Sequence, residues 1–370
     1  MSHMTYLEAS VVGLIQGVTE LFPVSSLGHN VLIPALIGGS WASDLNVSAA
    51  KSPYLAYIVG LHVATAIAMM IYFWRDWIRI IGGFFSSIRD REIRTVDQKL
   101  AWMIILATIP VGLVGAVGQK EFQALFAKPV RAAIFLIING LILFAGEKFR
   151  TRKSLAADAQ LAAAEAGTAD ARPVRRPAPA ATMADDPVLG GAVPEAAGVG
   201  GPDAVPARGT PARGAPVHAA AHASGQRAAR QLEASRAVEA DERLTAVGYL
   251  QALLIGSAQI LALLAGISRD GAVMVTGMFR GLSRADAARF SFLLSTPVIL
   301  AAGVLKFNDL TGPLSNGIHG QIIVGSILSG VGAYVSVRFL IKYFQTRTLT
   351  PFAIYCVVFG AFCVVYLQLK

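Results

Sequence analysis

The sequence predicts an all-α membrane protein with about six transmembrane helices and two re-entrant helical hairpins, arranged as an inverted-topology repeat. Three observations support this fold class. The 370-residue chain is 54% hydrophobic and only 15% charged, whereas soluble globular proteins carry about 25% charged residues. Six apolar stretches have lengths close to the roughly 20 residues that a helix needs to cross a bilayer. Two further apolar stretches are interrupted by short polar breaks.

The charges of the loops give the six predicted spans an orientation. These spans cover residues 53–74, 100–118, 131–147, 286–305, 320–340 and 350–369. The loops at 75–99, 280–289 and 338–348 are rich in Arg and Lys, as is typical of the cytoplasmic side of a membrane. Placing them inside leaves 119–131 and 306–319 outside, together with both ends of the chain.

Residues 5–38 and 246–280 are the two interrupted apolar stretches, and we interpret each as a re-entrant hairpin. The breaks read Ser25-Ser26-Leu27-Gly28 in the first and Ser268-Arg269-Asp270-Gly271 in the second. Irregular backbone at membrane depth is tolerated only where protein or a water-filled cavity surrounds it. The breaks therefore mark a candidate binding site.

A weak internal repeat relates the two hairpins. Gly17-Val18-Thr19-Glu20 precedes the first break and Gly256-Ser257-Ala258-Gln259 precedes the second, with four extra residues in the second copy. Each hairpin is followed by three spans. Paired interrupted segments in two halves indicate a site near the membrane midplane.

The predicted domains are a first membrane repeat at 1–150, an insert at 151–243 and a second membrane repeat at 244–370. The insert is dominated by Ala, Pro, Gly and Arg, a composition that cannot bury enough apolar surface to offset the entropy of ordering. We expect it to be disordered and cytoplasmic, although 226–243 has a helical composition.

The net charge of +9 does not indicate a nucleic-acid-binding protein. Its basic residues flank apolar runs or lie in the insert, and no basic face with interleaved aromatic residues is visible. The pairs Gly13/Gly17 and Gly277/Gly281 have the spacing that allows close helix packing in membranes.

Glu20 is the sharpest candidate functional residue. It lies deep in an apolar segment, four residues after Gln16 and so on the same helix face. Ionisable side chains inside a membrane are rare and indicate function by default. The alternative is a carboxylate at the membrane edge that caps the next helix.

Ser25, Ser26, Gly28 and His29 form the second candidate group. A serine after Pro23 is a natural helix N-cap, and a helix N-terminus in a low dielectric is also an anion site. Ser26 and His29 are three residues apart and share a helix face, so they could form a nucleophile and its base. His62, inside a span, is compatible with a polar packing role.

Ser268, Arg269 and Gly271 form the third group, again at a predicted helix start. An arginine in an apolar hairpin is costly unless it is paired, and its planar guanidinium suits a phosphate. The alternative is that Arg269 pairs with Asp270 or reaches the membrane interface. Two helix N-termini, an Arg and a Glu at one point predict a polyanion site, with a divalent cation bridging the polyanion to Glu20.

These motifs resemble the integral membrane family of bacterial undecaprenyl-diphosphatases. The resemblance rests on the runs Gln16 to His29, Gly266-Ile267-Ser268-Arg269, Gly281-Leu282-Ser283-Arg284 and Phe290-Ser291-Phe292. It covers both membrane halves and leaves out the insert. The sequence departs from the family pattern at Leu27, Ala265, Asp270 and Val273, where the family usually has Thr, Pro, Ser and Thr.

The resemblance implies hydrolysis of the C55 lipid diphosphate carrier to its monophosphate for cell-wall synthesis. It also implies a plasma-membrane protein with an active site open to the outer face and a need for Mg²⁺ or Ca²⁺. Carried over, Glu20 and Gln16 would serve the metal, Ser26 or His29 would be the nucleophile or its base, and Arg269 would hold the diphosphate with Ser268 beside it. The expected partners are the polyprenyl diphosphate and membrane lipids, and a homodimer is compatible with the sequence.

A transporter is the alternative function. Inverted repeats with broken helices are common among carriers, and the same phosphate clamp could serve a polyprenyl-phosphate flippase or an anion transporter. Such a carrier would need the clamp and would not need Ser26.

Overall fold

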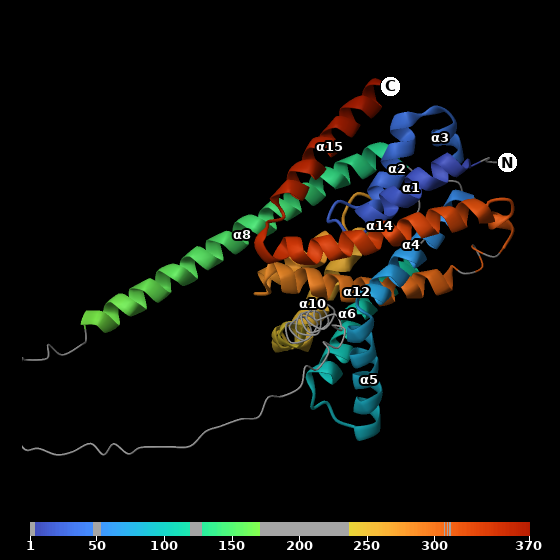
Figure 1. The fold of residues 1–370 in the computed structure, drawn as a ribbon. Coiled ribbons are helices and arrows are strands. Elements are labelled where there is room, and N and C mark those ends of the chain that lie inside the picture. Colours follow the sequence, from blue (N-terminus) through green and yellow to red (C-terminus); the bar gives the residue numbers. More distant parts are fainter. Residues whose placement is uncertain are drawn as a thin grey trace, which may run out of the picture. The chain divides into compact units, whose positions relative to one another are not determined.

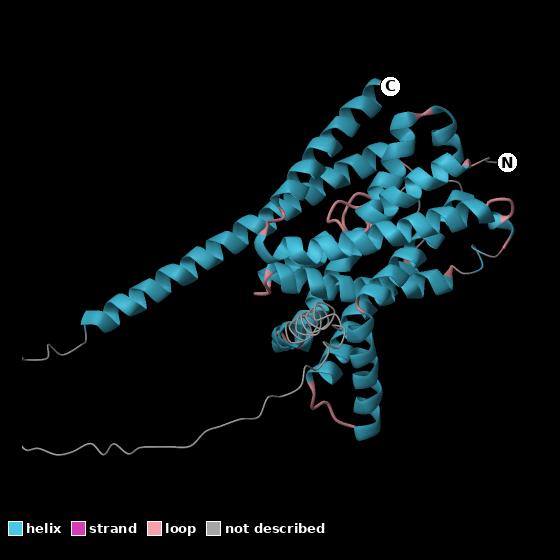
Figure 2. Cartoon of the chain, in the orientation of Figure 1, coloured by secondary structure: helices cyan, strands magenta, loops and turns pink. Residues whose placement is uncertain are grey.

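The computed structural model describes residues 4–46, 53–118, 128–170, 237–306, 308, 310 and 312–370. These residues form helices joined by loops, with no strand in the described part of the chain (Figure 2). The chain divides into two compact units, one made of Met1–Leu155 with Arg236–Lys370 and the other of Ala156–Ser235. All predicted membrane segments and site residues belong to the first unit.

The helices of the two halves follow each other along the chain as colour-coded in Figure 1. The first half contains α1 (Tyr6–Thr19), α2 (Ser26–Ile37), α3 (Gly39–Asp44), α4 (Pro53–Tyr72), α5 (Trp74–Asp90), α6 (Val96–Val117) and α8 (Pro129–Asp170). The second half contains α10 (Tyr249–Ser257), η1 (Ala258–Leu263), α11 (Arg269–Phe279), α12 (Arg284–Leu305), η2 (Pro313–Ser315), α14 (His319–Thr346) and α15 (Thr350–Leu369).

Six described helices are long and apolar enough to cross a membrane, as the sequence predicts. They are α4, α6, the Pro129–Arg150 part of α8, α12, α14 and α15. Each predicted break lies at the start of a helix. Ser25 and Ser268 come directly before α2 and α11, and the other residues of the two breaks form the first turns of these helices. The all-α membrane fold is therefore confirmed, while the re-entrant path of the two hairpins stays a prediction.

The two halves exchange equivalent contacts. Helix α1 packs along α14, where a Cβ on Gly17 would collide with the backbone of Ser329. Helix α10 packs along α6, where a Cβ on Gly256 would collide with Ala107. Each hairpin thus packs on the second span of the opposite half. This reciprocity agrees with a repeat, although its inverted orientation in a membrane stays a prediction.

The small-residue pairs behave differently from each other. Gly13 and Gly17 both lie against the backbone of α14, at Gly325 and Ser329, so the predicted close packing is confirmed there. At the other pair, Gly281 has no neighbour within 4 Å of an added Cβ among the described residues and a φ of +99°. It serves the turn before α12 instead, because this backbone conformation favours glycine.

The ends of the predicted insert are helical in the structure. Helix α8 continues through Asp170, although disorder is the expectation from residue 151 onward, and a further helix covers Ala237–Ala246, which overlaps the end of the insert with a helical composition. Alanine dominates 154–166 and has the highest helix propensity, which explains how a segment with too few apolar side chains for a core can still be helical. The predicted disorder of residues 171–236 lies outside the described residues.

An ion-pair network joins the segment Ala237–Ala246 to the first half. The fully buried Asp241 accepts from Arg79 at 2.7 Å and from Arg289 at 2.9 Å, and Asp76 contacts both arginines. Burial lowers the pKa of Arg79, but its hydrogen bonds with Asp76 and Asp241 outweigh burial and raise that pKa above its ordinary value. The segment before α10 is therefore part of the packed unit.

Candidate active site

A cavity of about 150 Å³ lies where the two chain breaks meet. Both halves of the chain contribute to its wall. Its lining residues are Glu20, Ser25, Ser26, Leu27, His62, Val111, Gln259, Ala262, Leu263, Ile267, Ser268, Arg269 and Val298. The predicted candidates Glu20, Ser26 and Arg269 thus face one cavity, although 249 residues separate the first from the last.

Glu20 is the centre of the polar contacts in this cavity. Its side chain is 8% exposed and accepts hydrogen bonds from Gln16 Nε2 at 2.8 Å, from Arg269 at 2.5 Å and from the Ser26 hydroxyl. His62 Nε2 lies 3.3 Å from Glu20 Oε2. Four donors from four different helices therefore converge on one carboxylate, which offsets the cost of burying its charge.

Local structure explains how Glu20 and Ser26 come together. Glu20 follows the last residue of α1 and Ser26 begins α2, so the short connection between the helices folds one side chain against the other. Ser25 adopts a φ of 68°, which is uncommon for a residue other than glycine. Its hydroxyl accepts from Gly28 N of its own helix and from Gly266 N of the other break, both at 3.2 Å.

Asn139 of α8 fastens the same two breaks from a third element. Its Nδ2 donates to the carbonyl of Pro23 at 2.9 Å, and its Oδ1 accepts from the backbone N–H of Ser268 at 3.0 Å. Asn139 is fully buried. Its amide side chain supplies one donor and one acceptor to backbone groups that have no partner within a helix. Asn139 therefore fixes the two breaks relative to each other.

The predicted pair of Ser26 and His29 is not brought together. His29 is 2% exposed, and its two ring nitrogens lie 2.7 Å from the Ser25 carbonyl and 2.7 Å from the Tyr355 hydroxyl. Its ring also stacks on Phe359 of α15. Ser26 and His29 are both in the first turn of α2, but their side chains have different partners. The His29 ring contacts α15, and the Ser26 hydroxyl donates to Glu20.

Two of the backbone N–H groups at the helix starts, where an anion site is predicted, donate to capping serines instead. The N–H of Gly28 donates to Ser25 Oγ and that of Gly271 donates to Ser268 Oγ at 3.1 Å. Both serines are therefore N-caps, one of the two interpretations that the sequence allowed. In this arrangement a phosphate at the cavity would meet Arg269 and Ser26 rather than these two glycine N–H groups.

Asp270 does not form the close ion pair with Arg269 that was the alternative for this arginine. The carboxylate is fully buried, 4.0 Å from Arg269 Nε, and accepts from Ser291 and Ser295, both at 2.7 Å. Arg269 directs its terminal nitrogen to Glu20 instead. Two hydroxyls of α12 thus bond Oδ1 of this acidic departure from the family pattern, while its Oδ2 has no hydrogen-bond partner among the described residues.

Sequence reasoning missed three polar residues around the cavity. The sequence is compatible with a packing role for His62, gives no sign that Asn139 belongs to a site, and indicates Gln259 only as the repeat partner of Glu20. Each is a polar side chain inside an apolar run, which is the signal that could have found them. Their partners come from distant segments, so the sequence alone could not show which site they serve.

The fit of these residues to a divalent cation rests on Glu20 alone. Gln16, the second predicted ligand, already donates to Glu20 and accepts from Asn30 Nδ2 at 2.6 Å. The described residues contain no group of three His, Cys, Asp or Glu side chains that could hold a metal. Glu20 still fits as a single carboxylate ligand, because Mg²⁺ is often held by one or two carboxylates with water and substrate phosphates.

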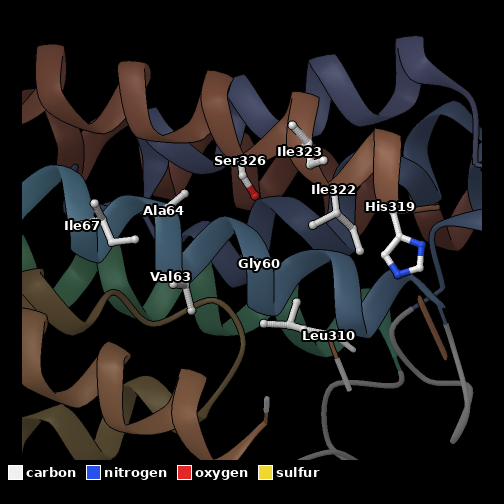
Figure 3. Close-up of a pocket in the computed structure, with 9 residues that line it drawn as sticks. All are labelled: Gly60, Val63, Ala64, Ile67, Leu310, His319, Ile322, Ile323 and Ser326. Atoms are coloured by element: carbon white, nitrogen blue, oxygen red, sulfur yellow. The ribbon is translucent and has the colours of Figure 1, made fainter. Parts of the chain in front are cut away.

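A larger cavity, of about 330 Å³, lies between α4 and α14 (Figure 3). It is lined by Gly60, Val63, Ala64, Ile67, Leu310, His319, Ile322, Ile323 and Ser326. Only His319 and Ser326 carry polar side-chain groups among them. Size alone would favour this cavity, but the smaller one holds the charged residues that phosphate chemistry requires.

Comparisons with known proteins agree with this geometry. The family model described as bacitracin resistance protein BacA matches residues 9–169 and 218–362. This chain belongs to the BacA family. A protein named undecaprenyl-diphosphatase from Mycolicibacterium paratuberculosis is 51% identical over 100% of this chain and 99% of its own length.

More distant relatives have the same kind of name. Undecaprenyl-diphosphatase 2 of Frankia alni is 49% identical over 99% of this chain and 98% of its own length. Undecaprenyl-diphosphatase 2 of Burkholderia orbicola is 32% identical over 97% of this chain and 95% of its own length. The BacA family resemblance therefore extends over nearly the whole chain.

Proposed function

We propose that this BacA family member hydrolyses undecaprenyl diphosphate to undecaprenyl phosphate and phosphate. The observation that carries the proposal is the meeting of Glu20, Ser26 and Arg269 in one cavity. A carboxylate, a hydroxyl and a guanidinium are the groups that positioning and charge neutralisation of a phosphoryl group require. The carrier alternative has no support from the names of the relatives.

The contacts suggest a division of roles among these residues. Arg269 binds the diphosphate, exchanging its contact with Glu20 for phosphate oxygens. Ser26 Oγ attacks the terminal phosphorus while its proton passes to Glu20, to which the hydroxyl already donates. A new Oγ–P bond forms, the P–O bond of the anhydride breaks, and the lipid monophosphate leaves. Water then hydrolyses the phosphoserine, releasing phosphate and restoring the Ser26 hydroxyl.

His29 and His62 take different roles in this proposal from those that the sequence suggested. His29 holds α2 against α15 through its bond with Tyr355. His62, at 3.3 Å from Glu20 Oε2, positions the carboxylate that receives the Ser26 proton. Glu20 is therefore the proposed base, because it is the group that accepts the Ser26 hydrogen bond in the structure.

A divalent cation, Mg²⁺ or Ca²⁺, is part of the proposal. Glu20 would be its ligand from the protein, and the cation would neutralise charge on the diphosphate oxygens. This requirement is supported by the single carboxylate at the cavity and by the high charge of a diphosphate.

The test is phosphate release from a polyprenyl diphosphate by the purified protein in detergent. We expect release that EDTA stops and Mg²⁺ or Ca²⁺ restores, and a Glu20→Ala variant that is at least 10³-fold slower, because one substitution removes both the proposed base and the proposed ligand. Absence of release from the wild-type protein would refute the phosphatase proposal. Phosphate release that is unchanged in EDTA would show that the reaction needs no divalent cation.

We further propose that the protein lies in the bacterial plasma membrane with the cavity opening to the outer face. The distribution of Arg and Lys among the loops supports this orientation. In a variant lacking Cys356 and Cys363, a cysteine at Asn316 should react with a membrane-impermeant maleimide in intact cells, and one at Glu92 should not. The reverse pattern would invert the topology. The homodimer stays a prediction, which a measurement of the molecular mass of the protein in detergent would test.

A further inference from the structure

Gln259 is a buried polar side chain whose amide is unpaired among the described residues. It is 1% exposed and lines the same cavity as Glu20, Ser26 and Arg269. Neither its Nε2 nor its Oε1 has a hydrogen-bond partner in the part of the chain that the structure describes. Buried amide groups in proteins are nearly always paired, so a side chain with both ends unpaired beside a cavity indicates a ligand.

The position of Gln259 in the chain gives an independent argument. In the internal repeat, Gly17-Val18-Thr19-Glu20 corresponds to Gly256-Ser257-Ala258-Gln259. The two glycines make matching contacts in the structure, Gly17 with α14 and Gly256 with α6. Gln259 is thus the counterpart of Glu20 in the second half, with a neutral amide in place of a carboxylate.

The local fold favours a role in binding over a role in folding. Helix α10 ends at Ser257 and Gln259 lies in the tighter η1 helix that follows. A glutamine kept for stability would be expected to bond backbone groups that lack a partner within a helix, as Asn139 does at Pro23 and Ser268. Gln259 instead lines the cavity with both of its polar side-chain atoms unpaired among the described residues.

We propose that Gln259 binds the diphosphate group of the substrate, as a neutral donor additional to Arg269. Its Nε2 donates to a phosphate oxygen, and its Oε1 accepts from a water or a protonated phosphate oxygen. This inference rests on the proposed phosphatase function for the identity of the anion. An amide suits this place because a second carboxylate beside Glu20 would repel a polyanion.

The decisive variant is Gln259→Leu, which has a similar volume and no polar atoms. We expect the KM for a polyprenyl diphosphate to rise about tenfold to a hundredfold, the range for losing a hydrogen bond to a charged group. We expect Tm in detergent to stay equal or rise, since the substitution removes an unpaired buried amide. Gln259→Glu should raise KM further than Gln259→Leu.

Gln98 provides a matched control because it is another buried glutamine and its amide is fully used. Its Oε1 accepts from Arg94 N at 2.7 Å and Thr95 N at 3.0 Å, and its Nε2 donates to Ser86 Oγ at 3.0 Å. Gln98→Leu should therefore lower Tm and leave KM near the wild-type value. A lower Tm with unchanged KM in Gln259→Leu would overturn the proposal and make Gln259 a structural residue.

Binding of inorganic diphosphate, measured by calorimetry without turnover, separates this inference from the proposed function. We expect the wild type to bind it and Gln259→Leu to bind it at least tenfold more weakly. Equal binding by both proteins, or none by the wild type, would overturn the role of Gln259. Weaker binding by the variant together with no phosphate release from lipid would retain the Gln259 contact and refute the phosphatase.

Discussion

Replacing Arg269 with Ala should reduce kcat/KM for a polyprenyl diphosphate by about 10³-fold or more, the lower end of what a transition-state arginine supplies in phosphoryl transfer. Arg269 is the cation that contacts Glu20 inside the cavity, at 2.5 Å. Its removal leaves the described lining of the cavity without a guanidinium for the phosphates. The measurement is phosphate release under steady-state conditions with purified variants.

Arg269→Lys should recover only part of this loss. A lysine keeps the charge beside Glu20 but lacks the planar fork that binds two phosphate oxygens at once. Arg338→Ala, at an exposed position on α14, is the matched control and should behave as the wild type. Near-normal turnover in Arg269→Ala would remove the phosphate clamp from the mechanism.

A double variant tests whether Arg269 and Glu20 act as a unit. If they do, Glu20→Ala combined with Arg269→Ala should be scarcely slower than either single variant, because residues in one contact network are not additive. Fully multiplicative losses would indicate independent roles. Tm should be measured for each variant to separate loss of activity from loss of folding. We expect Arg269→Ala to stay folded, because Glu20 keeps three other contacts when Arg269 is lost.

The sequence predicted the membrane fold well because span length and hydropathy are local properties. Six apolar runs became six helices, and Gly13 and Gly17 packed against α14 as their spacing indicated. The insert was less predictable at its ends. Residues 151–170 show that a composition too poor in apolar side chains for a core can still be helical, because propensity and burial are separate contributions.

The sequence predicted which residues belong to the site better than it predicted their contacts. Glu20 and Arg269 were identifiable because charge is expensive in an apolar segment, and they do meet. The partner of Ser26 was not identifiable, because the direction of the His29 ring depends on Tyr355, which lies 326 residues further along the chain. Likewise, nothing local to His62 indicates that Glu20 is its neighbour.

Ser26→Ala should lower kcat by about 10³-fold or more while leaving Tm and the binding of inorganic diphosphate close to the wild-type values. The reason is geometric. Ser26 contributes one hydroxyl to the Glu20 cluster, and Gln16, Arg269 and His62 remain as donors when it is lost. Ser25→Ala is the matched control, because its hydroxyl caps α2 and also accepts from Gly266 N. It should cost about 1 kcal/mol of stability or more.

The same comparison decides between Glu20 and His29 as the base for Ser26. His29 bonds the Ser25 carbonyl and Tyr355 and stacks on α15, so His29→Ala should lower Tm along with turnover. With Glu20 as the base, Glu20→Ala should match the loss of kcat in Ser26→Ala, and a phosphoserine should be trapped by rapid quenching of the wild type. If His29→Ala instead lost kcat to the same degree with its Tm intact, His29 would be the base and its ring would have to leave Tyr355 during turnover.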